Sequence, residues 1–194
     1  MAHTASSVLV DNLSQDRSLT RDLLWTVGFA LFTAVMAQVE VRLPFTPVPL
    51  TGQTFAVLLS GAVLGSRRAF ASQTLYLAGG AAGLPVFAGG GATILYLLGP
   101  TGGYLWSFPL AAALTGWLVE RGASRKAWKL ALSLLLSDVL ILASGAAWLH
   151  GWLGVPFRLA PLWGVYPFLI GDVLKISLVG VTLPRLLRRY EPHA

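Results

Sequence analysis

The sequence predicts an all-α integral membrane protein: a bundle of six transmembrane helices, with both termini in the cytoplasm and a ligand pocket open to the outer face. Composition is the first observation behind this prediction, because 55% of the 194 residues are hydrophobic and only 11% are charged. Soluble domains carry about 25% charged residues, so this chain has too few polar side chains to cover a soluble surface. The lengths of the apolar runs and the placement of basic residues between them are the second and third observations.

The apolar runs form one membrane domain at 23–189, between polar tails at 1–22 and 190–194 that are both expected in the cytoplasm. The first tail is expected to be disordered, and no cleavable signal is expected because the first apolar run begins only at Leu23. A helix needs about 20 residues to cross the hydrocarbon core, which leaves room for six spans joined by short loops. The predicted spans lie at 23–39, 51–65, 69–82, 103–119, 128–149 and 162–187.

The basic residues predict the orientation. Cytoplasmic segments of membrane proteins are enriched in Lys and Arg. With six spans and the amino terminus inside, eleven of the fourteen Lys and Arg fall in inner segments: Arg17, Arg21, Arg67, Arg68, Arg121, Arg125, Lys126, Lys129, Arg185, Arg188 and Arg189. Only Arg42 and Arg158 fall outside, and Lys175 lies within a span. The net charge of +6 is therefore interpreted as a topology signal, and no nucleic-acid partner is expected.

Two outer segments are unusual for loops. The stretch 42–51 carries three prolines within six residues, which prevent a helix and favour a stiff, extended backbone. The stretch 83–103 is rich in glycine and also contains apolar patches. Irregular backbone at membrane depth is tolerated where it is buried in protein or lines a cavity. Either these segments border a ligand site that opens outward, or they are ordinary linkers.

Three ionisable residues lie well inside predicted spans: Asp138, Asp172 and Lys175. A charge in lipid costs about 2.5 to 3.5 kcal/mol on insertion scales, so such residues face the interior and mark function by default. Asp172 and Lys175 are three residues apart and share one helix face. The alternative is an internal ion pair that only fixes packing, with Asp138 as a further partner of Lys175.

Neutral polar residues near the outer segments complete the predicted ligand site: Gln53, Tyr96, Thr101 and Tyr104. Arg42, beside the proline-rich loop, is either an interfacial anchor or a cation for a ligand carboxylate. Ala30 and Ala34 form a pair of small residues four apart, a spacing that allows another helix to approach closely.

Several motifs of enzymes are missing from the sequence. There is no Gly-x-x-x-x-Gly-Lys-Ser/Thr motif, so the chain is not itself a P-loop ATPase. There is also no cysteine and no His-Glu-x-x-His motif, and the three histidines lie near the termini or at a helix end. The sequence therefore predicts neither an enzyme nor a metal site or cofactor.

Four motifs in order along the chain resemble the BioY family. They are PVPLTGQT at 47–54, GGAAGLPVFAG at 79–89, LGPTGGY at 98–104 and YPFLIGDVLK at 166–175. Members of this family are biotin-specific substrate-binding subunits of energy-coupling factor (ECF) transporters. The resemblance implies a six-helix bundle in the bacterial cell membrane that binds biotin near its outer face.

The resemblance also implies partners and roles. Energy would come from a pair of ABC ATPases acting through a transmembrane coupling protein, which agrees with the missing P-loop. The family docks its coupling protein through small residues of the first span, which assigns that role to Ala30 and Ala34. Its last-span Asp and Lys line the pocket, which corresponds to Asp172 and Lys175, while its pocket Asn has no counterpart at 89–98. The competing hypothesis is a stand-alone secondary transporter that uses Asp138, Asp172 and Lys175 as a proton relay.

Overall fold

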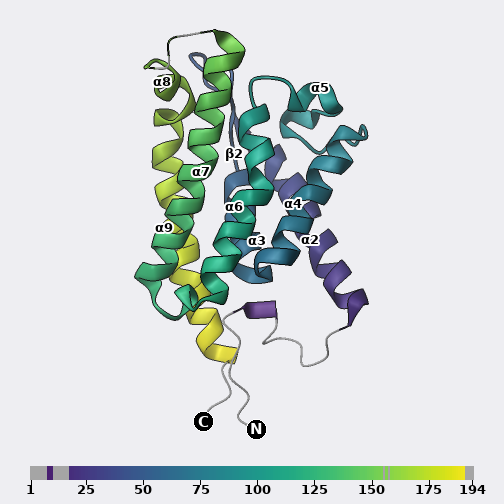
Figure 1. Ribbon diagram of the computed structural model, residues 1–194, viewed down its shortest axis with the longest axis vertical. Coiled ribbons are helices and arrows are strands. Elements are labelled where there is room, and N and C mark those ends of the chain that lie inside the picture. Colours follow the sequence, from purple (N-terminus) through teal and green to yellow (C-terminus); the bar gives the residue numbers. More distant parts are fainter. Residues whose placement is uncertain (1–7, 11–17, 155, 157, 191–194) are drawn as a thin grey trace.

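The computed structural model describes residues 8–10, 18–154, 156 and 158–190. It is a bundle of α-helices with one two-stranded sheet, so the all-helical prediction is confirmed (Figure 1). Six helices correspond to the predicted spans: α2 (Leu19–Gln38), α3 (Gln53–Leu64), α4 (Ser66–Ala81), α6 (Gly102–Glu120), α7 (Ala127–Leu153) and α9 (Tyr166–Tyr190). Helix α2 begins and helix α9 ends at the same end of the bundle (Figure 1).

Two short helices and a hairpin were not predicted from the sequence. Helices α5 (Ile94–Leu97) and α8 (Ala160–Gly164) lie at the end of the bundle opposite the start of α2 (Figure 1). Strands β1 (Glu40–Val41) and β2 (Leu50–Thr51) pair antiparallel, with Glu40 opposite Thr51. This hairpin ties down both ends of the proline-rich loop, whose backbone cannot be helical.

The six bundle helices differ in length. Helix α3 has 12 residues and α4 has 16, which correspond to about 18 and 24 Å, less than the ~30 Å hydrocarbon core. By length and composition, three described helices are able to cross a membrane alone, at Leu19–Gln38, Ala127–Trp152 and Tyr166–Leu183. The spans predicted at 51–65 and 69–82 were also shorter than a full crossing, in agreement with the lengths of α3 and α4.

Glycines set the junctions within the bundle. Gly65, at φ +79°, ends α3 and begins α4, a backbone conformation that residues with a Cβ rarely adopt. At Gly116 in α6, a Cβ would collide with the backbone of Ser66, so the two helices approach closely only because this position has no side chain. Close approach through small residues is typical of packing between membrane helices.

The core combines apolar packing with a buried hydrogen-bonding cluster. Gln73 of α4 is fully buried and donates from Nε2 to Thr33 Oγ1 of α2 at 3.1 Å and to Ser60 Oγ of α3 at 3.2 Å. One amide thus joins three helices. Large apolar side chains such as Leu24, Leu31 and Ile170 are exposed on the outside of the bundle, as expected for a surface that faces lipid.

The structure describes part of the predicted amino-terminal tail. Val8, Leu9 and Val10 are buried against the core, and Leu19 to Asp22 already belong to α2. Disorder throughout 1–22 is therefore not seen at these positions, because Val8 to Val10 have buried apolar side chains and Leu19 to Asp22 are helical. Residues 1–7, 11–17 and 191–194 lie outside the described part, and the division into tails and one membrane domain stays a prediction.

Candidate ligand-binding site

Two adjoining cavities lie at the end of the bundle that carries the hairpin and α5. The inner cavity measures about 30 Å³ and the outer one about 560 Å³. Ligand sites for small molecules usually measure about 300 to 1,000 Å³, so the inner cavity has room for water only. Four residues line both cavities and form the boundary between them: Pro49, Ala88, Tyr96 and Thr101.

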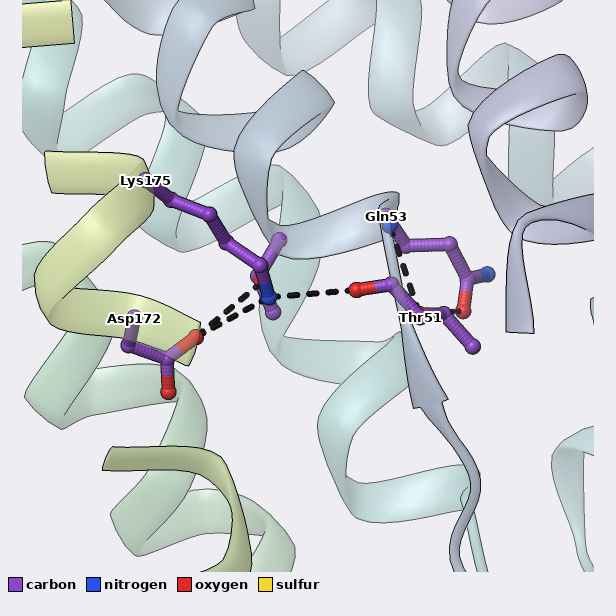
Figure 2. Close-up of polar contacts among 5 residues, drawn as sticks. Thr51, Gln53, Asp172 and Lys175 are labelled. Carbon is purple, nitrogen blue, oxygen red and sulfur yellow. Dashed lines mark hydrogen bonds and ion pairs between the residues drawn. The ribbon is translucent and has the colours of Figure 1, made fainter. Parts of the chain in front are cut away.

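Lys175 is the cation of the inner cavity. Its Nζ donates three hydrogen bonds: to Asp172 Oδ1 at 3.1 Å, to Thr54 Oγ1 at 2.7 Å and to the Thr51 carbonyl at 3.1 Å. Figure 2 shows the lysine reaching from α9 across to β2 and the start of α3. An ammonium has three donors, so all of them are engaged within the protein.

Asp172 lies behind Lys175 and does not itself line the inner cavity. It is 3% exposed, and its second oxygen, Oδ2, has no hydrogen-bond partner among the described residues. A buried carboxylate is costly without a partner, so the ion pair with Lys175 keeps this acid in place. Asp172 is therefore connected to the inner cavity through its ion pair with Lys175, and its direct contact with a ligand stays a prediction.

Gln53 forms a second polar wall of the inner cavity. Its Oε1 accepts from Thr51 Oγ1 at 2.8 Å and its Nε2 donates to the Tyr76 hydroxyl at 2.6 Å. The Tyr76 hydroxyl in turn donates to the Val86 carbonyl at 3.1 Å. This chain of hydrogen bonds links the hairpin, α3, α4 and the glycine-rich stretch, and it fixes the orientation of the Gln53 amide.

Aromatic side chains supply the apolar walls. Tyr104 donates its hydroxyl to the Gly164 carbonyl at 2.6 Å, so it offers the cavity its ring, which lies 5.8 Å from the ring of Phe168. Tyr96, at the boundary between the cavities, stacks on Phe87 at 5.0 Å and donates to the Ala88 carbonyl. Burial raises the pKa of the Tyr96 phenol above its ordinary value.

The outer cavity carries two charged side chains among its described lining residues, Glu40 and Arg42. Arg42 Nε donates to Glu40 Oε1 at 2.9 Å. The arginine side chain is 74% exposed, whereas that of Glu40 is 18% exposed. Of the two interpretations left open by the sequence, the place of Arg42 on the cavity wall favours a cation for a ligand.

Asp138 lies apart from both cavities. It is 2% exposed in α7, its Oδ1 has no partner among the described residues, and it interacts electrostatically with Asp172 and Lys175. Asp138 is not among the lining residues of either cavity, and its role in ligand binding stays a prediction. No cluster of three or more His, Cys, Asp or Glu side chains gathers in the described part of the chain.

The two predicted docking residues differ in position. Ala30 is buried by the chain's own helices, whereas Ala34 is half-buried at the edge of the exposed face of α2. That face is formed by larger apolar residues, with Val27, Leu31 and Val35 among them. Of the pair, only Ala34 is thus placed to touch another protein.

Several lining residues were missed by the sequence reasoning. Thr54 and Thr51 bind Lys175, and the inner cavity is also lined by Val48, Leu105, Phe108, Leu142 and Phe168. Thr54 had a usable signal, because it follows Gln53 in the motif at 47–54. Apolar residues within apolar spans carry no such signal.

Comparisons with known proteins place the chain in a family. The model of the BioY family matches residues 4–192. The chain belongs to the BioY family. A relative from Pyrococcus horikoshii, described as a probable biotin transporter BioY, is 39% identical over 158 residues, which are 81% of this chain and 91% of the relative. The biotin transporter BioY of Thermotoga maritima is 38% identical over 159 residues, covering 80% of this chain and 91% of the relative.

The fold of this BioY family member also matches a solved structure. The S-component for biotin from an ECF-type ABC transporter superposes with a TM-score of 0.81, covering 89% of this chain and 95% of the other. The two sequences are 24% identical, so this likeness concerns the fold. Together with the apolar surface of the bundle, it identifies a multi-pass membrane protein.

Proposed function

We propose that this chain is the biotin-binding membrane subunit of an ECF-type vitamin importer. The observation that carries the proposal is the Lys175–Asp172 pair at the wall of a cavity, in a chain whose relatives are described as biotin transporters. The protein binds the vitamin and is not an enzyme. It needs no cofactor, because ATP is used by partner subunits.

The chemistry of the cavities matches the two ends of biotin. The ureido carbonyl accepts from Lys175, which gives up one of its bonds within the protein, and the rings of Tyr104 and Phe168 face the apolar bicycle. The valerate carboxylate extends into the outer cavity toward Arg42. Gln53 is within the same wall and is suited to bind the ureido group.

Entry of the bicycle requires the loop to move. Val48 and Pro49 line the inner cavity, which has room for water only, and Thr46 Oγ1 tethers the loop to α8 by donating to the Trp163 carbonyl at 2.8 Å. Displacing this segment joins the two cavities into one space of ligand size. The loop is therefore the proposed entrance.

The proposed topology has six membrane segments and both termini in the cytoplasm. Eleven of fourteen Lys and Arg then lie inside, in accordance with the positive-inside rule. The chain has no native cysteine, so single cysteines report the sides directly. Ala127→Cys should be protected from an impermeant thiol reagent in intact cells, and Arg158→Cys should react. Labelling of Ala127→Cys from outside would contradict this orientation.

The proposed partners are a transmembrane coupling protein and a pair of ABC ATPases. The support is the fold shared with an ECF S-component and the absence of a P-loop from the sequence. The edge of α2 near Ala34 is the proposed contact with the coupling protein. Nothing in the comparisons favours the alternative of a stand-alone proton-coupled transporter.

The decisive experiment is a binding titration with the purified full chain in detergent, without ATP. Biotin should bind with a 1:1 stoichiometry, while riboflavin and thiamine at the same concentrations should not. Lys129→Met serves as a matched control. It removes an exposed lysine of α7 that lines neither the inner nor the outer cavity. Absence of biotin binding, or equal binding of the other vitamins, would overturn the proposal.

A further inference from the structure

The mouth of the outer cavity contains an ion pair between neighbours on one loop. Glu40 belongs to β1 and Arg42 follows it by two residues. The pair lies over Gly89: a Cβ at that position would collide with Arg42 Nη2 and would meet Glu40 Oε1 at 3.3 Å. Gly89 also has φ +63°, a backbone conformation that favours glycine. Both the backbone and the lack of a side chain at this position therefore leave space for the ion pair. The guanidinium therefore lies close to the backbone of the glycine-rich stretch at Gly89.

Glu40 is poorly satisfied in this arrangement. Its Oε1 accepts from Arg42 Nε, but its Oε2 is buried and has no hydrogen-bond partner among the described residues. A largely buried carboxylate that has a single charged partner depends on that partner. Arg42 is in the opposite situation, because its exposed guanidinium carries five N–H donors and only the Nε–H bond is made within the described part of the chain.

A ligand carboxylate at this mouth therefore meets a guanidinium that still has free N–H donors but whose charge is already partly balanced by Glu40. Two carboxylates that share one guanidinium repel each other, so the incoming group gains less than it would from a free arginine. Glu40 is also paired in register with Thr51, whose carbonyl accepts from Lys175. The hairpin thus connects the charged mouth to the inner cavity.

We propose that Glu40 sets the selectivity of the mouth by competing with the ligand carboxylate for Arg42. A free carboxylate that is not anchored elsewhere gains little from this partly neutralised guanidinium. A carboxylate whose ring system is already held at Lys175 is present at high effective concentration and binds the remaining N–H donors of Arg42 despite the repulsion from Glu40. The Glu40–Arg42 pair thus disfavours binding of small organic anions and still allows binding of a vitamin with an acidic tail. This inference rests on the proposed function.

The test compares biotin with biotin amide, which has the same ring and a neutral tail. Glu40→Gln should tighten biotin about three-fold, because solvent around the exposed Arg42 side chain screens its interaction with Glu40, and should change the amide by less than about two-fold. Arg42→Gln should weaken biotin about ten-fold and leave the amide unchanged. The double variant should bind like Arg42→Gln alone, since the competition requires the arginine. Arg158→Gln, which removes a charge from the same end of the bundle but lines neither cavity, should change neither ligand.

Several outcomes overturn the inference. Weaker biotin binding by Glu40→Gln would mean that Glu40 only positions Arg42, and equal changes for biotin and its amide would remove both residues from carboxylate recognition. If Glu40→Gln fails to fold, Glu40→Asp replaces it in the test, because the shorter side chain does not reach Arg42. Glu40→Asp should also tighten biotin and not its amide. If it does not tighten biotin, the inference is wrong. A wild-type chain that binds no biotin would instead contradict the proposed function, so the two failures are distinguishable.

Discussion

Replacing Lys175 by methionine tests whether the buried ion pair recognises the ligand or only holds α9 in place. The change keeps a long, flexible side chain and removes three hydrogen bonds, to Asp172, Thr54 and Thr51. If the lysine donates to the ureido carbonyl of biotin, the loss of one hydrogen bond to a charged group costs about 1.5 to 3 kcal/mol. Biotin should then bind about ten- to a hundred-fold more weakly.

The same change also affects stability, and the magnitude follows from burial. Asp172 is 3% exposed and loses its cation, and leaving one member of a buried pair uncompensated typically costs about 3 to 5 kcal/mol. Asp172→Asn is milder, because Lys175 keeps its bonds to the two threonines, so affinity should fall less than in Lys175→Met. The double neutral variant should regain most of the lost stability, because no buried charge is left without a partner.

Binding and stability are measured separately on each variant. Isothermal titration with biotin gives the affinity, and thermal unfolding in the same detergent gives the stability, with Lys129→Met as the control for loss of a lysine. The double variant, Asp172→Asn with Lys175→Met, distinguishes a role in ligand recognition from a role in packing alone. If it recovers stability but stays weak for biotin, Lys175 belongs to the recognition site. If it binds biotin as tightly as the wild type, the pair only fixes packing and the site is elsewhere.

Four further changes have clear expectations. Gln73→Leu removes the amide that joins α2, α3 and α4, and it should lower the free energy of unfolding by about 1 kcal/mol with biotin affinity unchanged. Tyr104→Phe keeps the ring in the cavity and loses the bond to α8, so unfolding should be easier by about 1 kcal/mol while affinity changes less than about three-fold. Thr46→Val releases the loop from α8 and should raise both association and dissociation rates of biotin in stopped flow, with a smaller effect on Kd. Ala34→Trp should block uptake in cells that contain the ECF module, yet leave binding by the purified chain intact; loss of both would place this face in the core instead.

The helices of the bundle were predictable because burial in lipid requires long apolar runs, which hydropathy reveals directly. The short helices α5 and α8 were not, because four or five residues give no periodic signal within glycine-rich or proline-containing segments. The length of α3 was also overestimated at its start. Its first turn begins only after the β2 strand, and a two-residue strand has no pattern that distinguishes it from a helix end.

The candidate site was predictable where residues were chemically out of place. A lysine in a span, or a glutamine just after a proline-rich loop, is noticeable in any membrane segment, and both Lys175 and Gln53 line the inner cavity. Asp138 is equally noticeable but lines neither cavity. The sequence shows how deep a residue lies along a helix, but not which neighbouring helix its side chain faces. Phe168 was missed for the opposite reason, since an aromatic residue in an apolar span is unremarkable.

The two cavities and their charged groups imply an order of events for a ligand with a polar head and an acidic tail. The outer cavity, at about 560 Å³, admits such a molecule as the bundle stands, whereas the inner one, at about 30 Å³, does not. The first encounter is therefore at the mouth, where Glu40 already holds Arg42 and the gain for the tail is small. Stable binding requires the head to open the loop and exchange a bond with Lys175, whose three donors are engaged beforehand. Because the hairpin pairs Glu40 with Thr51, we expect a shift that frees the Thr51 carbonyl from Lys175 to move Glu40 as well.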